Sequence, residues 1–93
     1  MYATIRRYPG NRELAENLAA RGEEVMAILQ GVDGFRAYFL IRTDDGAASV
    51  TVCDDRSGAE ETNQVAASWL KENMPGAAAN PPEITAGEVV LSA

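Results

Sequence analysis

The chain has 93 residues, of which 46% are hydrophobic, and its 14 acidic and 8 basic side chains give a net charge of -6 at pH 7. A chain of this length folds around one small core, so we expect a single domain over residues 1–93. The negative charge argues against nucleic acid and membrane surfaces as partners, because both attract clusters of Lys and Arg.

The chain contains no histidine and only one cysteine, Cys53. It therefore lacks the partners for an internal disulfide or a zinc site, and we expect neither a metal nor a cofactor. No apolar stretch is long enough for a signal peptide or a membrane span. These features predict a soluble protein of the reducing cytoplasm.

The first half of the chain predicts three strands and one helix. Residues 2–8 mix β-branched and aromatic side chains and stop at a Pro-Gly turn, as a strand does. Asn11 is then expected to cap a helix, and residues 35–42 alternate with the period of two of a strand. The pair Asp45-Gly46 predicts a tight turn into a third strand over residues 47–54. The apolar stripe of the helix consists of Leu14, Leu18, Val25 and Leu29.

A second helix is predicted directly after the third strand, with Asp55 or Ser57 as its cap. Glu60 lies three residues after Ser57, which is the spacing of a capping box. Prolines in residues 77–82 predict a loop, and residues 83–91 predict a last strand. The apolar face of this helix consists of Val65, Ala66, Trp69 and Leu70.

The element order β-α-β-β-α-β predicts an α+β fold of the ferredoxin-like type. In that fold a four-stranded antiparallel sheet carries two helices on one face. The other face would expose more apolar surface than a small monomer usually leaves in water. We therefore expect a homodimer that forms through the sheet faces, which makes a dimeric α/β barrel.

Several short pieces of the chain occur in the order and spacing of one known family. With them, the chain resembles the antibiotic-biosynthesis-monooxygenase-like members of the dimeric α/β-barrel superfamily over nearly its whole length. The pieces are Met1-Tyr2-Ala3-Thr4-Ile5-Arg6-Arg7-Tyr8, Gly34-Phe35, Ser49-Val50-Thr51-Val52, Asp54-Asp55-Arg56 and Trp69-Leu70-Lys71.

This resemblance implies a pocket between the sheet and the helices of each subunit. Enzymatic relatives use it to oxygenate quinol-like aromatic substrates without metal or flavin, or to bind and degrade haem. The haem degraders combine a helix tryptophan, which Trp69 matches, with an iron-ligating histidine and an asparagine on the first strand. This chain has no histidine and carries Thr4, Arg6 and Arg7 on its first strand, which argues against haem degradation.

Four side chains are candidates for lining the pocket: Trp69, Asn73, Tyr38 and Arg6. Trp69 combines a broad ring with one N–H donor, and Asn73 lies one helical turn beyond it. Tyr38 and Arg6 are strand residues with polar tips that suit a bound phenol or carboxylate. Each also has a structural interpretation: Trp69 as a core anchor, Asn73 as a helix-end cap, Tyr38 in the dimer interface and Arg6 paired with Glu88.

The sequence leaves two functions open. The first is a cofactor-independent monooxygenase acting on a small aromatic or quinol-like substrate, with Trp69 orienting the substrate and Asn73, Tyr38 or Arg6 stabilising an anion. The second is a non-catalytic homodimeric module that binds a small apolar ligand or a protein partner, because the chain offers no convincing acid-base pair. Cys53 is expected to be a small strand residue, since neighbouring carboxylates oppose thiolate formation.

Overall fold

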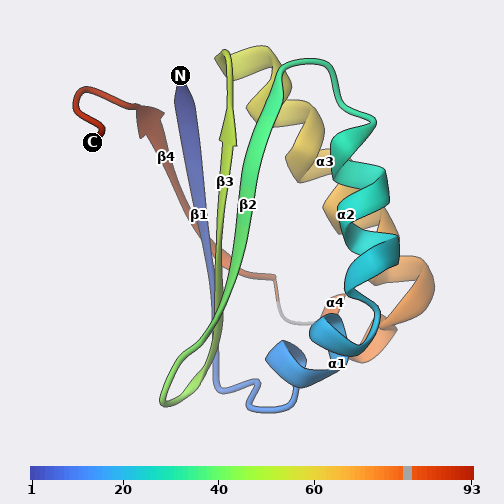
Figure 1. Cartoon of the computed structure of the whole chain (residues 1–93). Coiled ribbons are helices and arrows are strands. Elements are labelled where there is room, and N and C mark those ends of the chain that lie inside the picture. The colour runs from blue at the N-terminus through green and yellow to red at the C-terminus, as the bar shows by residue number, and fades with distance from the viewer. Residues whose placement is uncertain (79–80) are drawn as a thin grey trace.

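A computed structural model describes residues 1–78 and 81–93 (Figure 1). Its strands and helices occur in the predicted order, except that the first predicted helix is divided in two and a short additional helix follows the second. They are β1 (Tyr2–Pro9), α1 (Leu14–Ala20), α2 (Gly22–Gln30), β2 (Phe35–Arg42), β3 (Gly46–Cys53), α3 (Arg56–Asn73), α4 (Pro75–Ala78) and β4 (Glu83–Glu88).

The strands form one four-stranded sheet in the order β2-β3-β1-β4, and every neighbouring pair is antiparallel. The helices lie together on one face of this sheet (Figure 1). The predicted ferredoxin-like α+β fold is therefore confirmed. The last strand is shorter than predicted, because pairing with β1 ends at Glu88.

The hairpin between β2 and β3 closes through reciprocal backbone hydrogen bonds between Thr43 and Gly46. Gly46 begins β3 and is buried. A Cβ atom at this position would collide with the backbone oxygen of Tyr8 on β1. Glycine is thus needed here because two backbones approach each other closely.

Alternation along each strand separates a helix-covered face from an open face. On β1, Thr4, Arg6 and Tyr8 are buried, whereas Ile5 and Arg7 between them are exposed. Cross-strand pairing places Val50 of β3 between Ile5 and the exposed Phe39 of β2. The sheet therefore presents several polar side chains of β1 to the helices, while Ile5 and Phe39 are exposed on the open side.

The first predicted helix is divided at Arg21, whose backbone (φ -114°, ψ 27°) leaves the helical region between α1 and α2. Asn11 is not its cap, because α1 begins after Glu13 and receives no capping hydrogen bond from a side chain. Of the two candidate caps of α3, Asp55 is the one observed, because its Oδ1 accepts a hydrogen bond of 2.9 Å from the backbone N–H of Gly58. This bond satisfies one of the free N–H groups of the first turn.

Part of the predicted loop over residues 77–82 is wrong, because Pro75–Ala78 form the short helix α4. Proline at the first position of a helix loses no hydrogen bond, which allows α4 to start directly after α3. Residues 79 and 80 of the predicted loop lie outside the described residues.

The core lies between the sheet and the helices. Its buried members come from β1, β3 and the helices and are Tyr8, Leu14, Ala15, Leu18, Val25, Leu29, Ala47, Trp69 and Leu70. Of the helices within residues 1–78 and 81–93, none is both long enough and apolar enough to cross a bilayer.

Candidate functional site

A small polar cluster interrupts this apolar core. It surrounds a cavity of about 20 Å³, large enough for roughly one water molecule. The polar lining comes from Arg6 and Tyr8 on β1, Tyr38 on β2 and Ser49 on β3, while Trp69 supplies the largest ring on the helix side. Three strands and α3 thus converge on one point.

Arg6 is the most unusual member of the cluster, because it is a cation that is only 4% exposed. Its Nη2 donates a hydrogen bond to Oδ1 of Asn63, a neutral side chain on α3. Burial lowers the pKa of Arg6, and the neighbouring Tyr8 and Tyr38 act in the opposite direction. A guanidinium nevertheless stays charged at neutral pH, so the cluster holds a positive charge in the core.

The alternative ion pair between Arg6 and Glu88 is wrong. In the antiparallel register of β1 and β4, Arg6 lies opposite Ile84, whereas Glu88 lies opposite Tyr2 at the other end of the strand. Glu88 is also exposed, whereas Arg6 points to the helix side.

The tyrosines Tyr8 and Tyr38 flank the guanidinium. Burial raises the pKa of Tyr8, and Arg6 lowers it in part. Burial likewise raises the pKa of Tyr38, with a further contribution from Tyr8, while Arg6 and a contact with Ser49 act in the opposite direction. Both hydroxyls are therefore neutral at physiological pH and able to donate hydrogen bonds. Tyr38 packs against the helix-side core, so its placement in an interface on the open face is wrong.

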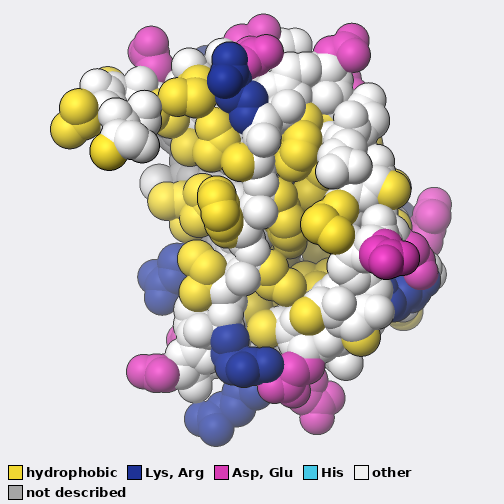
Figure 2. Space-filling model, in the orientation of Figure 1, with side chains coloured by type: hydrophobic (Ala, Val, Ile, Leu, Met, Phe, Trp, Pro, Cys, Tyr) yellow, Lys and Arg dark blue, Asp and Glu magenta, His cyan; other side chains and the backbone are white. Residues whose placement is uncertain are grey.

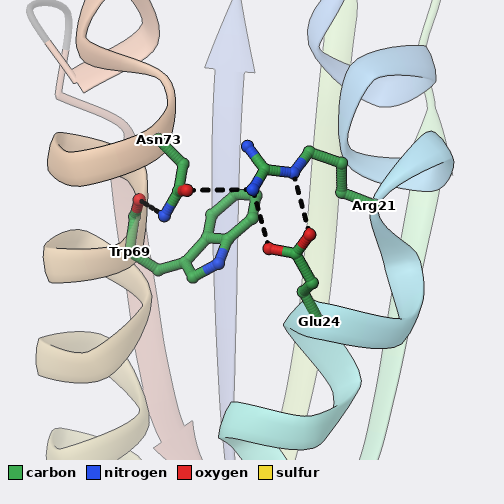
Figure 3. A network of polar contacts seen from close by, with 4 residues as sticks. All are labelled: Arg21, Glu24, Trp69 and Asn73. Atoms are coloured by element: carbon green, nitrogen blue, oxygen red, sulfur yellow. Dashed lines mark hydrogen bonds and ion pairs between the residues drawn. The ribbon is translucent and has the colours of Figure 1, made fainter.

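Trp69 closes the helix side of the cluster and is 9% exposed. The guanidinium of Arg21 lies 4.9 Å from its ring centroid, which is a cation-π contact. Arg21 reaches this position from the break between α1 and α2, and it also bonds Glu24 (2.7 Å) and Oδ1 of Asn73 (2.9 Å) (Figure 3). Asn73 itself donates to the backbone oxygen of Trp69 (2.9 Å), as a helix-end cap would.

The structure thus brings Arg6, Tyr38 and Trp69 together around the cavity and leaves Asn73 outside it, beside Arg21. Sequence reasoning missed Asn63 and Tyr8. Asn63 lies four residues after the buried Ala59 and seven before the buried Leu70, and a polar residue within such a stripe is a usable signal. Tyr8 follows Arg6 by two residues, so strand alternation alone places both on one face.

Three of the aromatic side chains that line this cavity also line larger hollows at the surface. Trp69 also borders a hollow of about 380 Å³ between α2 and α3. Tyr38 borders one of about 260 Å³ beside α1, α2 and β2. Tyr8 borders an apolar cleft of about 430 Å³ near the end of α3. Ligand pockets usually measure about 300–1,000 Å³, so the 20 Å³ cavity itself is smaller than a ligand pocket, whereas the hollows beside Trp69 and Tyr8 reach that size.

Cys53 takes no part in this site. It is 0% exposed, and burial raises the pKa of its thiol. A thiol in this state is a poor nucleophile. Across residues 1–78 and 81–93, no three side chains of the types His, Cys, Asp and Glu form a group that could hold a metal ion.

Neither a protein-family model nor a curated protein matches the sequence significantly. Solved structures, in contrast, match nearly the whole chain. A protein of unknown function from Nitrosomonas europaea, NE2512, has a TM-score of 0.73 at 20% identity, with 99% of this chain and 91% of that chain covered.

Two further matches have titles that describe a ligand or an activity. A mutant of MhuD with two manganese protoporphyrin IX molecules bound per active site has a TM-score of 0.72 at 17% identity, with 100% and 98% of the two chains covered. SnoaB from Streptomyces nogalater, described as a cofactor-independent oxygenase, has a TM-score of 0.66 at 16% identity, with 98% and 94% covered. At these identities the likeness shows the fold, which is the fold that the family resemblance implies.

Proposed function

We propose that the protein belongs to the antibiotic-biosynthesis-monooxygenase-like family and is a cofactor-independent monooxygenase acting on a small aromatic or quinol-like substrate. The observation that carries this proposal is the buried cation Arg6, which lines one cavity in the core together with Tyr8, Tyr38 and Trp69. The cluster lies between the sheet and the helices of a fold shared with the oxygenase SnoaB.

The reaction needs an electron-rich ring and a site that stabilises its anion. In the proposed step, the ring of a phenolate gives its electrons to O₂ and forms a carbon–oxygen bond. One oxygen atom stays on the ring as a quinone carbonyl, and the other leaves as water with the hydrogens of the hydroxyl group and of the attacked carbon. All electrons come from the substrate. Arg6 and the hydroxyls of Tyr8 and Tyr38 would stabilise the phenolate, and Trp69 would stack on its ring.

Oxygen uptake over a panel of naphthols, anthrols and hydroquinones tests this function. The wild type should consume O₂ with at least one member, in a ratio of one O₂ to one quinone formed. Trp69→Phe keeps an aromatic core side chain but loses the indole, so its kcat/KM should fall about tenfold or more, as for other positioning contacts. Arg12→Gln, a change in an exposed turn, is the matched control. Uptake that is equal in Trp69→Phe and wild type, or absent with every substrate, contradicts the proposal.

A non-catalytic binding module is the second candidate. The observation in its favour is that none of the residues lining the cavity is a carboxylate or a histidine, so the lining itself offers no general base at neutral pH. A small aromatic or apolar ligand retained in native mass spectrometry, without any O₂ consumption, would favour this function over the oxygenase.

A homodimer through the open sheet face completes the proposal. Ile5, Phe39 and Ile41 on this face are 40%, 59% and 44% exposed. Seen from the side of β2, hydrophobic side chains gather in the middle of the molecule and charged ones lie mostly toward its periphery (Figure 2). A second copy of the same face would cover this apolar surface.

Sedimentation tests the dimer. We expect a species of about twice the 9.9 kDa mass of one chain, which Phe39→Glu should convert to monomer. Met26 on α2 is also 45% exposed but lies on the helix side, so Met26→Glu should leave the dimer intact. A wild type that stays monomeric at micromolar concentration contradicts this part of the proposal.

We also propose a cytoplasmic location, which the reduced, buried thiol of Cys53 suits. Fractionation of cells that express a tagged chain would test it.

A further inference from the structure

Arg6 carries a buried charge that has no counter-ion among the residues that the structure describes. The described residues, 1–78 and 81–93, form four ion pairs, all at exposed or partly exposed positions. None of these pairs includes Arg6. Its partner Asn63 is neutral and can accept only part of what five guanidinium N–H groups can donate. An ionised group in the core is costly unless an opposite charge compensates it.

The chain has 14 acidic residues, so it does not lack carboxylates that could have filled this role. The other side chains with polar atoms that line the cavity beside Arg6 are instead Tyr8, Tyr38, Ser49 and Trp69. These groups donate hydrogen bonds or offer a flat surface, and none of them adds a negative charge at neutral pH. The surroundings therefore suit an anionic group that comes from outside the chain.

The same lining also limits how a ligand can acquire its charge. Arg6 is a cation, and burial raises the pKa of both tyrosines, so none of the three can take a proton from a bound phenol at neutral pH. A ligand that is already ionised in solution therefore fits this site without any proton transfer to the protein.

We propose that the cluster of Arg6, Tyr8, Tyr38 and Trp69 selects aromatic acids that are ionised in solution, such as aryl carboxylates or acidic hydroxyquinones, over neutral aromatic molecules. The anionic group lies against Arg6 and the tyrosine hydroxyls, and the ring lies against Trp69. This inference rests on the proposed function for the location of the site and adds the substrate class.

Calorimetric titration with naphthoate and naphthamide tests the inference, because the two probes share a ring and differ in charge. Wild type should bind naphthoate about 10- to 100-fold more tightly than naphthamide, which is the usual value of a hydrogen-bonded charge. Arg6→Gln should abolish this preference, while Arg6→Lys, which keeps the charge, should retain part of it. Arg12→Gln should keep the whole preference, because it removes a charge from an exposed turn.

Equal affinity of wild type for the two probes would overturn the inference, and so would undetectable binding of naphthoate at millimolar concentration. A naphthoate preference that survives in folded Arg6→Gln would also overturn it, and circular dichroism establishes that each variant is folded. Arg6→Lys gives a second comparison if Arg6→Gln does not fold. Selective binding of naphthoate without any oxygen uptake would support this inference and contradict the oxygenase function. Oxygen uptake with neutral phenols, without a preference for naphthoate, would support the oxygenase function and contradict this inference.

Discussion

Replacing Arg6 by methionine should stabilise the protein. Arg6 is 4% exposed, and its guanidinium bonds the neutral side chain of Asn63. Desolvation of a single charge costs several kcal/mol after relaxation, whereas a hydrogen bond to a charged group returns about 1.5–3 kcal/mol. Methionine keeps most of the apolar stem and removes the charge. The free energy of unfolding should therefore rise by about 1–3 kcal/mol.

Thermal and urea unfolding of Arg6→Met at the protein concentration used for wild type would measure this change. For a domain of this size, each kcal/mol raises the melting temperature by about 4–8 °C. A site kept for ligand binding is expected to reduce stability in this way. If Arg6→Met unfolds more readily than wild type by 1 kcal/mol or more (about 4–8 °C), then Arg6 is a structural residue and the reasoning is refuted.

Three further predictions concern the fold and its titratable groups. Gly46→Ala should lower the free energy of unfolding, measured by urea titration, by at least about 2 kcal/mol, because the added Cβ would collide with the backbone of Tyr8. Gly87→Ala is the control and should have little effect, because a Cβ at this position meets no atom within 4 Å. The pKa of Tyr38 is raised in the folded state, so the stability due to its neutral form is complete below the unfolded pKa near 10 and is lost as pH rises through the folded pKa. Tyr38→Phe should therefore lose less stability than wild type between about pH 9 and 11 in urea titrations, and an equal loss would contradict this sign. Cys53 should react with a thiol reagent at least about 100-fold more slowly in the native protein than in urea, because burial shields the thiol and raises its pKa. Fast labelling of the native protein would contradict this prediction and show that this end of the sheet opens.

Strand positions and the hairpin could be predicted from the sequence because alternation and turn chemistry are local properties. The break at Arg21 could not. Leu18 and Val25 are seven residues apart, which keeps them on one stripe whether the helix is continuous or interrupted between them.

The face on which Arg6 lies also escaped sequence reasoning. Each of the two faces of β1 carries one arginine, Arg6 on one face and Arg7 on the other. The face with Arg7 also carries the aliphatic Ile5, yet it is the open one. Alternation shows that the faces are separate but not which one the helices cover. The register of β1 with β4 decided against Glu88 as a partner, and such long-range pairing depends on the whole sheet.

The central claim is that an aromatic anion binds inside the core, between Arg6 and Trp69. Trp69 is the only tryptophan, so its indole N–H gives a single identifiable NMR signal. During titration with naphthoate, this signal and the guanidinium signal of Arg6 should shift together and saturate at one ligand per chain. If both stay fixed while signals from Phe39 and Ile41 on the open face shift, the ligand binds outside the core and the claim is contradicted.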